Sequence, residues 1–291
     1  MKDVQSQTDM RRIPLKHVGI KNLRWPVILK DKEQGEQHSV ATISLAVDLP
    51  HEIRGTHMSR FVECMQTVGA ISPTGLEEVL DKLKEHLQAE KAFIQMEFPY
   101  FIYKTSPVTG QRAPMDLNCV LTAEKKDEFK LRIMAEVPVQ TLCPCSKEIS
   151  DYGAHNQRAL AWIEIEADGL VWIEELAEMA DAGASAPVYS LLKRPDEKFV
   201  TEKAYDNPRF VEDAVREIAL RLEADKRIKW YEVTVESIES IHNHNAFACV
   251  EKGWQARLLN LMNITLYMKL PRWGCTLPAL AFLRPKAELF P

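Results

Sequence analysis

The sequence has too few cysteines and too little excess charge for several classes of protein. Only 6 of the 291 residues are cysteine and most stand alone, so a disulfide framework is excluded and a reducing, cytoplasmic setting is expected. The formal net charge of −5 argues against a general nucleic-acid-binding protein. With 46% hydrophobic and 27% charged residues, the composition is that of an ordinary soluble globular chain.

The chain also lacks a long, uninterrupted apolar run. Residues 1–13 are polar and charged, without the apolar segment of a signal peptide or anchor, and predict a flexible tail. Residues 255–270 are fairly apolar, but an arginine, a lysine and two asparagines interrupt them. The run is too short for a convincing membrane span and favours an amphipathic helix packed on the protein or on a partner. No membrane association is therefore expected.

Hydrophobic periodicity predicts strands and helices in a repeating order. In the first half, strands are expected at 40–49, 92–103 and 115–123, and helices at 59–68 and 76–88. In the second half, strands are expected at 128–140, 158–167, 229–241 and 246–251, and helices at 172–183 and 208–224. The order of strands, two helices and strands thus occurs twice, which predicts an α+β fold.

Each repeat is expected to form an antiparallel sheet with paired helices on one face. The boundary between the two units is predicted near residue 125, where the first set of strands ends. The first unit would then span 14–125 and the second 126–254, with most candidate site residues in the second. Residues 255–291 form an extension of unknown role.

The densest group of reactive side chains contains two cysteines and a histidine. Cys143 and Cys145 flank Pro144, and His155 follows in a polar loop that leads into a predicted strand. In an extended chain, residues two apart face the same side, so both thiols could point at one place. A thiolate near an imidazole can hold a metal or act as a nucleophile, and two ordinary buried thiols are the alternative. Without a four-cysteine set, an open catalytic metal site is favoured over a closed structural one.

Two more histidines and a glutamate could belong to the same site. His242 and His244 are flanked by asparagines and are expected at the end of a strand, where alternation places both on one face. A solvated turn is the alternative, because asparagine and histidine both favour turns. Glu197 lies in the charged segment 194–198, whose simplest interpretation is a solvated loop.

Glu212 is expected in the first turn of a helix. Asn207 is suited to cap that helix and Pro208 to occupy its first position. A carboxylate there is stabilised by the helix dipole, and it is also well placed to accept hydrogen bonds from a ligand. From the residues alone, the generic stabilising role is the stronger interpretation.

Four segments together resemble one family, GTP cyclohydrolase of type IB. They are GTHMSRF at 55–61, LCPCSKEISDYGAHNQRA at 142–159, EKAYDNPRFVEDAVR at 202–216 and IHNHNAFACVEKGW at 241–254. The likeness covers residues 14–254 and leaves 255–291 without a counterpart. The resemblance implies a tunnelling fold (T-fold) with two units in one chain, assembled as a homotetramer with active sites between subunits.

The resemblance also implies a metal site. Cys143, His155 and Glu197 would be the ligands, and His242 would lie close to the metal and take part in proton transfer, for which His155 is a second candidate. Such a mixed set of sulfur, nitrogen and oxygen donors admits zinc, manganese or iron. The resemblance assigns Cys145 and His244 no specific role.

For the substrate, the resemblance implies that Glu212 binds the guanine edge of GTP. Three basic residues in the matched segments are candidate contacts of the triphosphate, with a solvated surface role as the alternative; they are Arg60, Lys147 and Arg158. The implied reaction hydrolyses GTP at carbon 8 of guanine, releases formate and rearranges the ribose to give 7,8-dihydroneopterin triphosphate. This is the first step of tetrahydrofolate biosynthesis, although a cyclic phosphate product stays open.

Two other hypotheses are compatible with the same residues. A nitrile reductase of the same fold superfamily would use Cys143 or Cys145 as a nucleophile together with NADPH, without a metal. A non-enzymatic zinc-binding module would turn over no nucleotide and would unfold on chelation. The histidines and carboxylates outside the Cys143–Cys145 tract argue against such a module.

Overall fold

The computed structural model describes residue 5, residues 7–66 and residues 71–252. The described residues belong to one compact unit, to which everything below refers. The predicted amphipathic helix at 255–270 therefore lies outside the described residues. No helix in the described part of the chain is long and apolar enough to cross a membrane.

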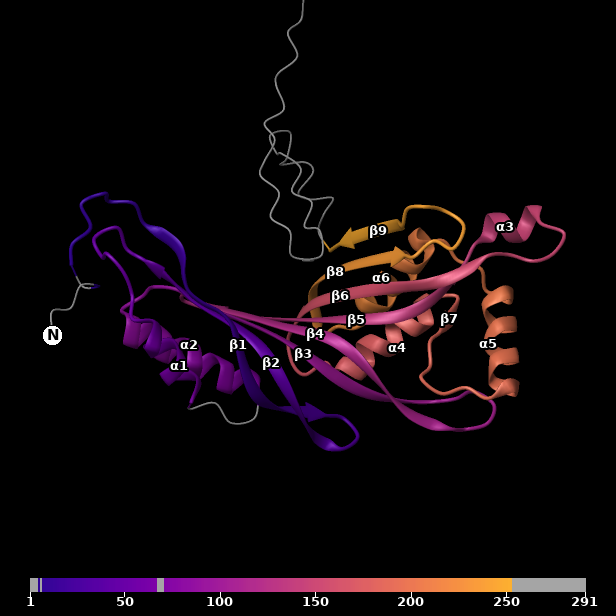
Figure 1. Ribbon diagram of the computed structural model, residues 1–291, viewed down its shortest axis with the longest axis horizontal. Coiled ribbons are helices and arrows are strands. Elements are labelled where there is room, and N and C mark those ends of the chain that lie inside the picture. Colours follow the sequence, from indigo (N-terminus) through magenta and orange to yellow (C-terminus); the bar gives the residue numbers. More distant parts are fainter. Residues whose placement is uncertain (1–4, 6, 67–70, 253–291) are drawn as a thin grey trace, which may run out of the picture. The chain divides into compact units, whose positions relative to one another are not determined.

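One antiparallel sheet runs through the whole described part of the chain, from β1 to β9 (Figure 1). Its strands lie in the order β1-β2-β3-β4-β5-β6-β8-β9, and the short β7 (Ala186–Pro187) pairs with β5. The longer strands are β1 (Leu15–Asp31), β2 (Gly35–Leu49), β3 (Ala92–Thr105), β4 (Arg112–Lys125), β5 (Phe129–Leu142), β6 (Asn156–Ala167), β8 (Ile228–Ser237) and β9 (Ala246–Glu251).

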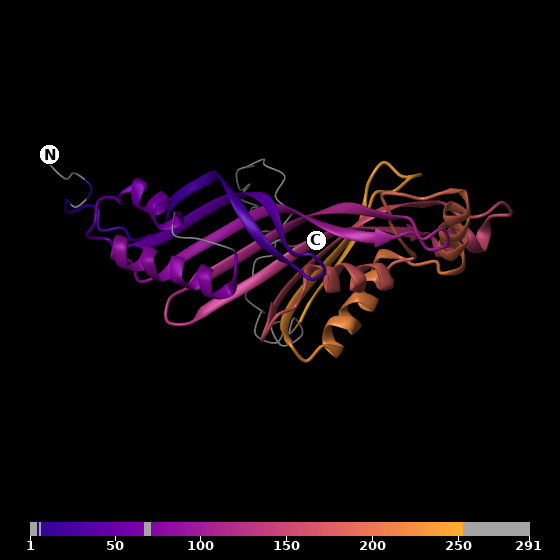
Figure 2. The same cartoon turned by 90° about the horizontal axis from the view of Figure 1, so that it is seen from below.

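The helices connect these strands at three places in the chain. Between β2 and β3 lie α1 (Met58–Met65) and α2 (Pro73–Leu87), and between β5 and β6 lies the short α3 (Pro144–Ile149). Between β6 and β8 lie α4 (Ile173–Gly183), α5 (Arg194–Asp206) and α6 (Val211–Ala224). Helix α2 packs on β2, β3 and β4, whereas α4 packs on β5 and β6 and α6 on β8 and β9 (Figures 1 and 2).

The larger of two hydrophobic clusters in the described residues lies between the sheet and helices α1, α2, α4 and α6, and a smaller one lies under α5. The buried positions of the larger cluster stay in register from strand to strand, because Phe98, Cys119, Ala135, Ile163 and Val233 are each paired with the next across β3, β4, β5, β6 and β8. All five belong to one cluster of buried residues. Since side chains alternate between the faces of a strand, this register makes one face of the sheet continuously apolar.

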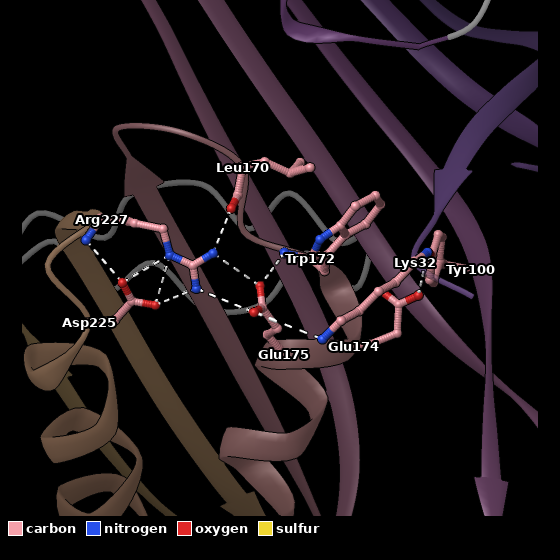
Figure 3. Close-up of polar contacts among 8 residues, drawn as sticks. All are labelled: Lys32, Tyr100, Leu170, Trp172, Glu174, Glu175, Asp225 and Arg227. Atoms are coloured by element: carbon pink, nitrogen blue, oxygen red, sulfur yellow. Dashed lines mark hydrogen bonds and ion pairs between the residues drawn. The ribbon is translucent and has the colours of Figure 1, made fainter. Parts of the chain in front are cut away.

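A polar network also joins the two halves of this unit (Figure 3). At the start of α4, Glu174 accepts hydrogen bonds from the Tyr100 hydroxyl on β3 (3.0 Å) and from the backbone N–H of Lys32 after β1 (3.1 Å). The adjacent Glu175 caps the first turn of α4 and pairs with Arg227 (3.4 Å) before β8. Burial would raise the pKa of Glu175, but these bonds outweigh it and lower the pKa.

The α+β class and the antiparallel sheet are confirmed, and the predicted strands correspond to β2, β3, β4, β5, β6, β8 and β9. Strand β1, at the edge of the sheet, had no counterpart in the prediction, although Leu23, Trp25, Val27 and Leu29 alternate along it with more exposed residues. The expected flexible tail is wrong in part, since Thr8 forms a β-bridge with Ile53 and Asp9 donates to the carbonyl of Glu52.

Candidate active site

The register of β5 and β6 brings Cys143 and His155 together. These strands end in the pair Leu142 and Asn156, and the ladder continues by one step, because the backbone N–H of Cys143 donates to the carbonyl of His155 (3.1 Å). The loop between them folds back in turn, since the N–H of His155 donates to Ser146 Oγ (3.1 Å). The predicted proximity of this thiol and imidazole thus follows from their opposite positions in one hairpin.

The conformation predicted for the two cysteines is wrong. Cys143 is the N-cap of α3, its Sγ accepting from the N–H of Ser146 (3.4 Å), and Pro144 starts the helix. Cys145 therefore lies in a helical turn and is exposed, whereas Cys143 is half-buried. A proline at the first helical position is favoured because its missing N–H needs no partner there. The two thiols are not related by strand alternation.

The residues that follow β8 also reach the site and bring Glu239 next to His155. Strand β8 pairs with β6 up to Ala159 and Ser237, and the N–H of Ile238 donates to the carbonyl of Arg158 (3.0 Å). Glu239 follows, with Oε2 at 4.0 Å from His155 Nδ1 and only 10% of its side chain exposed. This largely buried carboxylate was absent from the predicted site, because its position depends on pairing between strands about sixty residues apart in sequence.

His242 and His244 also reach this place, although the strand predicted for them is wrong. Strand β8 ends at Ser237, and both histidines lie in an exposed loop before β9. Their rings stack with centroids 5.1 Å apart, and the His242 ring meets that of His155 edge-on at 6.5 Å. The described structure therefore gathers Cys143, His155 and His242, while His244 lies behind His242.

Glu197 lies elsewhere in this unit. The predicted solvated loop at 194–198 is wrong, because these residues form the first turn of α5. Asp196 fixes that turn: it is fully buried and accepts from the N–H groups of Val108 and Thr109 in the β3–β4 turn (2.8 Å each) and of Lys193 (2.9 Å). Burial would raise the pKa of Asp196, but these bonds and that of the Thr109 hydroxyl hold it far below its usual range.

The far end of α5 is the end that approaches Cys143. There, the Lys147 ammonium of α3 lies 4.2 Å from the centre of the Tyr205 ring. Eight residues separate Tyr205 from Glu197, which corresponds to about 12 Å along a helix axis. In agreement, the described residues contain no group of three His, Cys, Asp or Glu side chains that could hold a metal ion.

Two of the three predicted ligands nevertheless fit a divalent metal. A thiol and an imidazole are the donors that zinc prefers, and they lie opposite each other at the end of one hairpin. His155 Nδ1 is 2.9 Å from Gln157 Oε1, so the other ring nitrogen, Nε2, is the one available to a metal. The third ligand, Glu197, is not brought to this pair within one chain.

Glu212 lies in the first turn of α6, as expected, but the predicted cap is wrong. Helix α6 begins at Val211, and Asn207 instead ends α5 and donates from Nδ2 to the carbonyls of Ala184 and Ser185. Asp213 performs the capping, since it accepts from the N–H of Phe210 (3.1 Å). The Glu212 side chain is exposed and does not serve as the cap.

The α5–α6 junction connects Glu212 to the Cys143 region. The N–H of Arg209 donates to the carbonyl of Leu142, the residue before Cys143 (3.0 Å). An open groove of about 450 Å³ runs over this junction and is lined by Asn207, Pro208, Arg209, Asp213, Arg216, Glu217 and Leu220. A concave surface therefore adjoins the helix turn that carries Glu212.

The three predicted triphosphate contacts are separated in space. Lys147 lies in α3 beside Tyr205, and Arg158 is exposed on β6, so both belong to the end of the sheet that carries Cys143. Arg60 lies on α1, where it donates to the carbonyl of His86 (2.6 Å) at the end of α2. Figure 1 shows α1 and α3 at opposite ends of this unit.

Comparison with known proteins gives a consistent result. The family model described as type I GTP cyclohydrolase folE2 matches residues 1–248. GTP cyclohydrolase FolE2 of Thermotoga maritima is 57% identical over 253 residues, covering 87% of this chain and 98% of that protein. The Caldicellulosiruptor bescii enzyme of the same name is 56% identical over 251 residues, covering 86% and 98%. Among solved structures, uricase from Arthrobacter globiformis has a TM-score of 0.46 at 7% identity, over 81% of this chain and 92% of that chain.

Proposed function

The chain belongs to the type I GTP cyclohydrolase family FolE2, and we propose from this membership that it hydrolyses GTP to 7,8-dihydroneopterin triphosphate and formate, the first step of tetrahydrofolate biosynthesis. The observation that carries the proposal is the 57% identity over nearly the whole of a relative bearing that name. The site geometry agrees, because Cys143, His155 and His242 lie together at one end of the sheet. We propose that the enzyme acts in the cytoplasm.

A divalent metal is proposed at Cys143, His155 and Glu197, with zinc, manganese or iron as the candidates. When bound, such a metal lowers the pKa of water from 15.7 to about 7 and so supplies hydroxide near neutral pH. The support is the thiol–imidazole pair at the end of the β5–β6 hairpin, and the contact of His155 Nδ1 with Gln157, which leaves Nε2 free for a ligand bond.

The remaining side chains are proposed to bind the purine and move protons. His242 is 6.5 Å from His155 by ring centroids, within reach of a shared substrate, and would protonate the ring nitrogen beside carbon 8. Protonation there makes carbon 8 more electrophilic. The Glu212 carboxylate would accept hydrogen bonds from the guanine N1–H and exocyclic amine, while Arg60, Lys147 and Arg158 would contact the triphosphate.

A homotetramer with active sites between subunits is proposed, each subunit made of two T-fold units that meet near residue 125. The order β1-β2-α1-α2-β3-β4 followed by a second strand–helix–strand set supports the tandem. The separation within one chain supports shared sites: Glu197 is in the first turn of α5, at the end away from Cys143, and Arg60 is on α1, at the opposite end of the unit from α3 (Figure 1). A second copy could supply both residues to the Cys143–His155 pair.

Mixing two inactive variants would test whether sites are shared. We expect Cys143→Ala and Glu197→Ala each to be inactive, and subunits refolded or co-expressed together to regain activity, because some sites would then receive neither substitution. With random equal mixing, on the order of one quarter of wild-type activity is the ceiling for sites built from two chains. Formate release by the mixture, compared with each variant alone, is the measurement. No recovery in proven hetero-oligomers would place Glu197 and Cys143 in the same chain's site.

The activity itself is tested by incubating the purified protein with GTP and zinc, manganese or iron(II) under reducing conditions. We expect equimolar formate and a pterin that fluoresces after oxidation, both lost after chelation and restored by metal. NADPH is included in a parallel sample, because its consumption would indicate the reductase chemistry of related cysteine enzymes. Absence of formate with every metal would contradict the proposal.

A further inference from the structure

The side-chain amide of Gln157, next to Cys143 and His155, makes all the hydrogen bonds that it can make. Its Oε1 is 2.9 Å from His155 Nδ1 and accepts from Ser240 Oγ (3.4 Å). Its Nε2 donates to Thr141 Oγ1 (3.3 Å) and to Glu239 Oε1 (3.4 Å). An amide has two donor hydrogens and two acceptor positions, and the four contacts use all of them.

Strand register places Gln157 at the centre of this group. Thr141 is paired with Gln157 across β5 and β6, and Glu239 lies on the other side, two residues beyond the last β8 pair. Cys143 follows Thr141 by two residues and His155 precedes Gln157 by two, and residues two apart face the same side of a strand. Thr141, Gln157 and Glu239 therefore lie directly behind the thiol and the imidazole.

The chemistry of Glu239 fixes which way the amide points. A carboxylate only accepts hydrogen bonds, so the amide nitrogen of Gln157 must face Glu239 and its oxygen must face His155. An amide oxygen in turn accepts only, so the hydrogen of a neutral His155 ring must lie on Nδ1. The lone pair is then on Nε2.

We propose that Gln157 is a positioning residue that fixes the Nδ1–H tautomer of His155 and so holds Nε2 ready for the divalent metal. The inference rests on the metal role proposed for His155. A histidine ligand usually donates its other ring N–H to an acceptor, and loss of that acceptor lowers metal affinity about 10–100-fold. Here a neutral amide is the acceptor, and Glu239 and Thr141 act by orienting it.

Metal affinity provides the first test. Gln157→Leu keeps the approximate size of the side chain but cannot accept from His155, so zinc should bind about 10–100-fold more weakly in competition with a chromophoric chelator. Gln140→Leu is the matched control, because Gln140 lies on the neighbouring strand and its amide contacts Asn156 (3.1 Å) rather than His155. Its zinc affinity should equal that of the wild type.

A swapped pair separates the hydrogen-bond argument from a general packing effect. In Gln157→Glu/Glu239→Gln, the new carboxylate at position 157 accepts from His155, and the new amide at position 239 donates to that carboxylate. Both hydrogen bonds are therefore restored. We expect the double variant to bind zinc nearly as tightly as the wild type and more tightly than Gln157→Leu. An affinity of the double variant as low as that of Gln157→Leu would count against the proposal.

The His155 tautomer can be read without any metal, from the ¹⁵N shifts of labelled imidazoles in the apoprotein, with His155→Asn to assign the signal. We expect Nδ1–H in the wild type and a shift towards Nε2–H in Gln157→Leu. If the wild type binds no metal, the metal dependence in the proposed function is wrong. The spectrum of the apoprotein still tests the role of Gln157 in that case. An Nε2–H wild type, or unchanged tautomer and affinity in Gln157→Leu, would overturn the inference.

Discussion

Replacing Cys143 with serine is expected to remove the bound metal and to lower formate release from GTP by about 10³-fold or more. A metal contributes several kcal/mol to such a reaction, and each 1.36 kcal/mol is a factor of ten in rate. Cys143 also caps α3 through Sγ, which accepts from the N–H of Ser146. Serine is a preferred N-cap, so this variant keeps the helix and removes only the soft ligand.

Two companion variants make that result specific to Cys143. Cys143→Ala removes both the cap and the ligand, so it should also lose about 1 kcal/mol of stability, whereas Cys143→Ser should not. Cys249→Ala removes an exposed thiol on β9 and should keep both metal and activity. Metal content per subunit, thermal unfolding and formate release are measured together. A Cys143→Ser protein that retains one metal per subunit and normal turnover would exclude Cys143 as a ligand.

The strands and the Cys143–His155 pair could be predicted because their signals are local. Alternation of apolar residues marks β5 and β6, and the thirteen residues from Cys143 to His155 are a suitable length for a connection between them. The proximity of Cys143 and His155 is confirmed, but the extended conformation predicted for the two cysteines is wrong. Pro144 at the first helical position, preceded by a residue able to cap, was a readable sign of α3.

Gln157 and Glu239 could not be predicted in the same way. Gln157 is two residues from His155 and shares its face, which is a local signal, but a glutamine on a strand has many ordinary roles. Glu239 reaches Gln157 only because β8 returns to pair with β6 after three helices. Such pairing depends on packing over the whole core, which a single sequence does not reveal.

Helix α5 shows a similar limit. Its apolar stripe is weak, since within its 13 residues only Asp196, Val200 and Ala204 are buried, and the charged segment 194–198 therefore looked solvated. The helix is held instead by the buried Asp196, whose partners Val108 and Thr109 lie almost ninety residues earlier in the chain. A long-range polar anchor of this kind leaves no periodic pattern.

Replacing Glu212 with glutamine is expected to lower kcat/KM for GTP by about 10²–10⁴-fold with little change in stability. The carboxylate would accept two hydrogen bonds from guanine, each worth about 1.5–3 kcal/mol when one partner is charged. Glutamine offers one acceptor and turns a donor towards the guanine donors. The fold does not need this carboxylate, because Asp213 caps α6 and Glu212 is exposed. Steady-state formate release and thermal unfolding are the measurements.

Asp213→Asn is the matched control, because it weakens the cap of α6 without touching the proposed guanine contact. Its effects should be the reverse of those of Glu212→Gln: lower stability and nearly normal kcat/KM.

The substrate offers an independent control. Inosine triphosphate lacks the exocyclic amine, so the wild type should discriminate strongly against it, since a site built for a donor is left unpaired without one. In Glu212→Gln that discrimination should largely disappear, because the acceptor that detects the amine is gone. If Glu212→Gln loses activity equally towards both nucleotides and keeps the preference for GTP, then Glu212 acts on something other than the guanine edge.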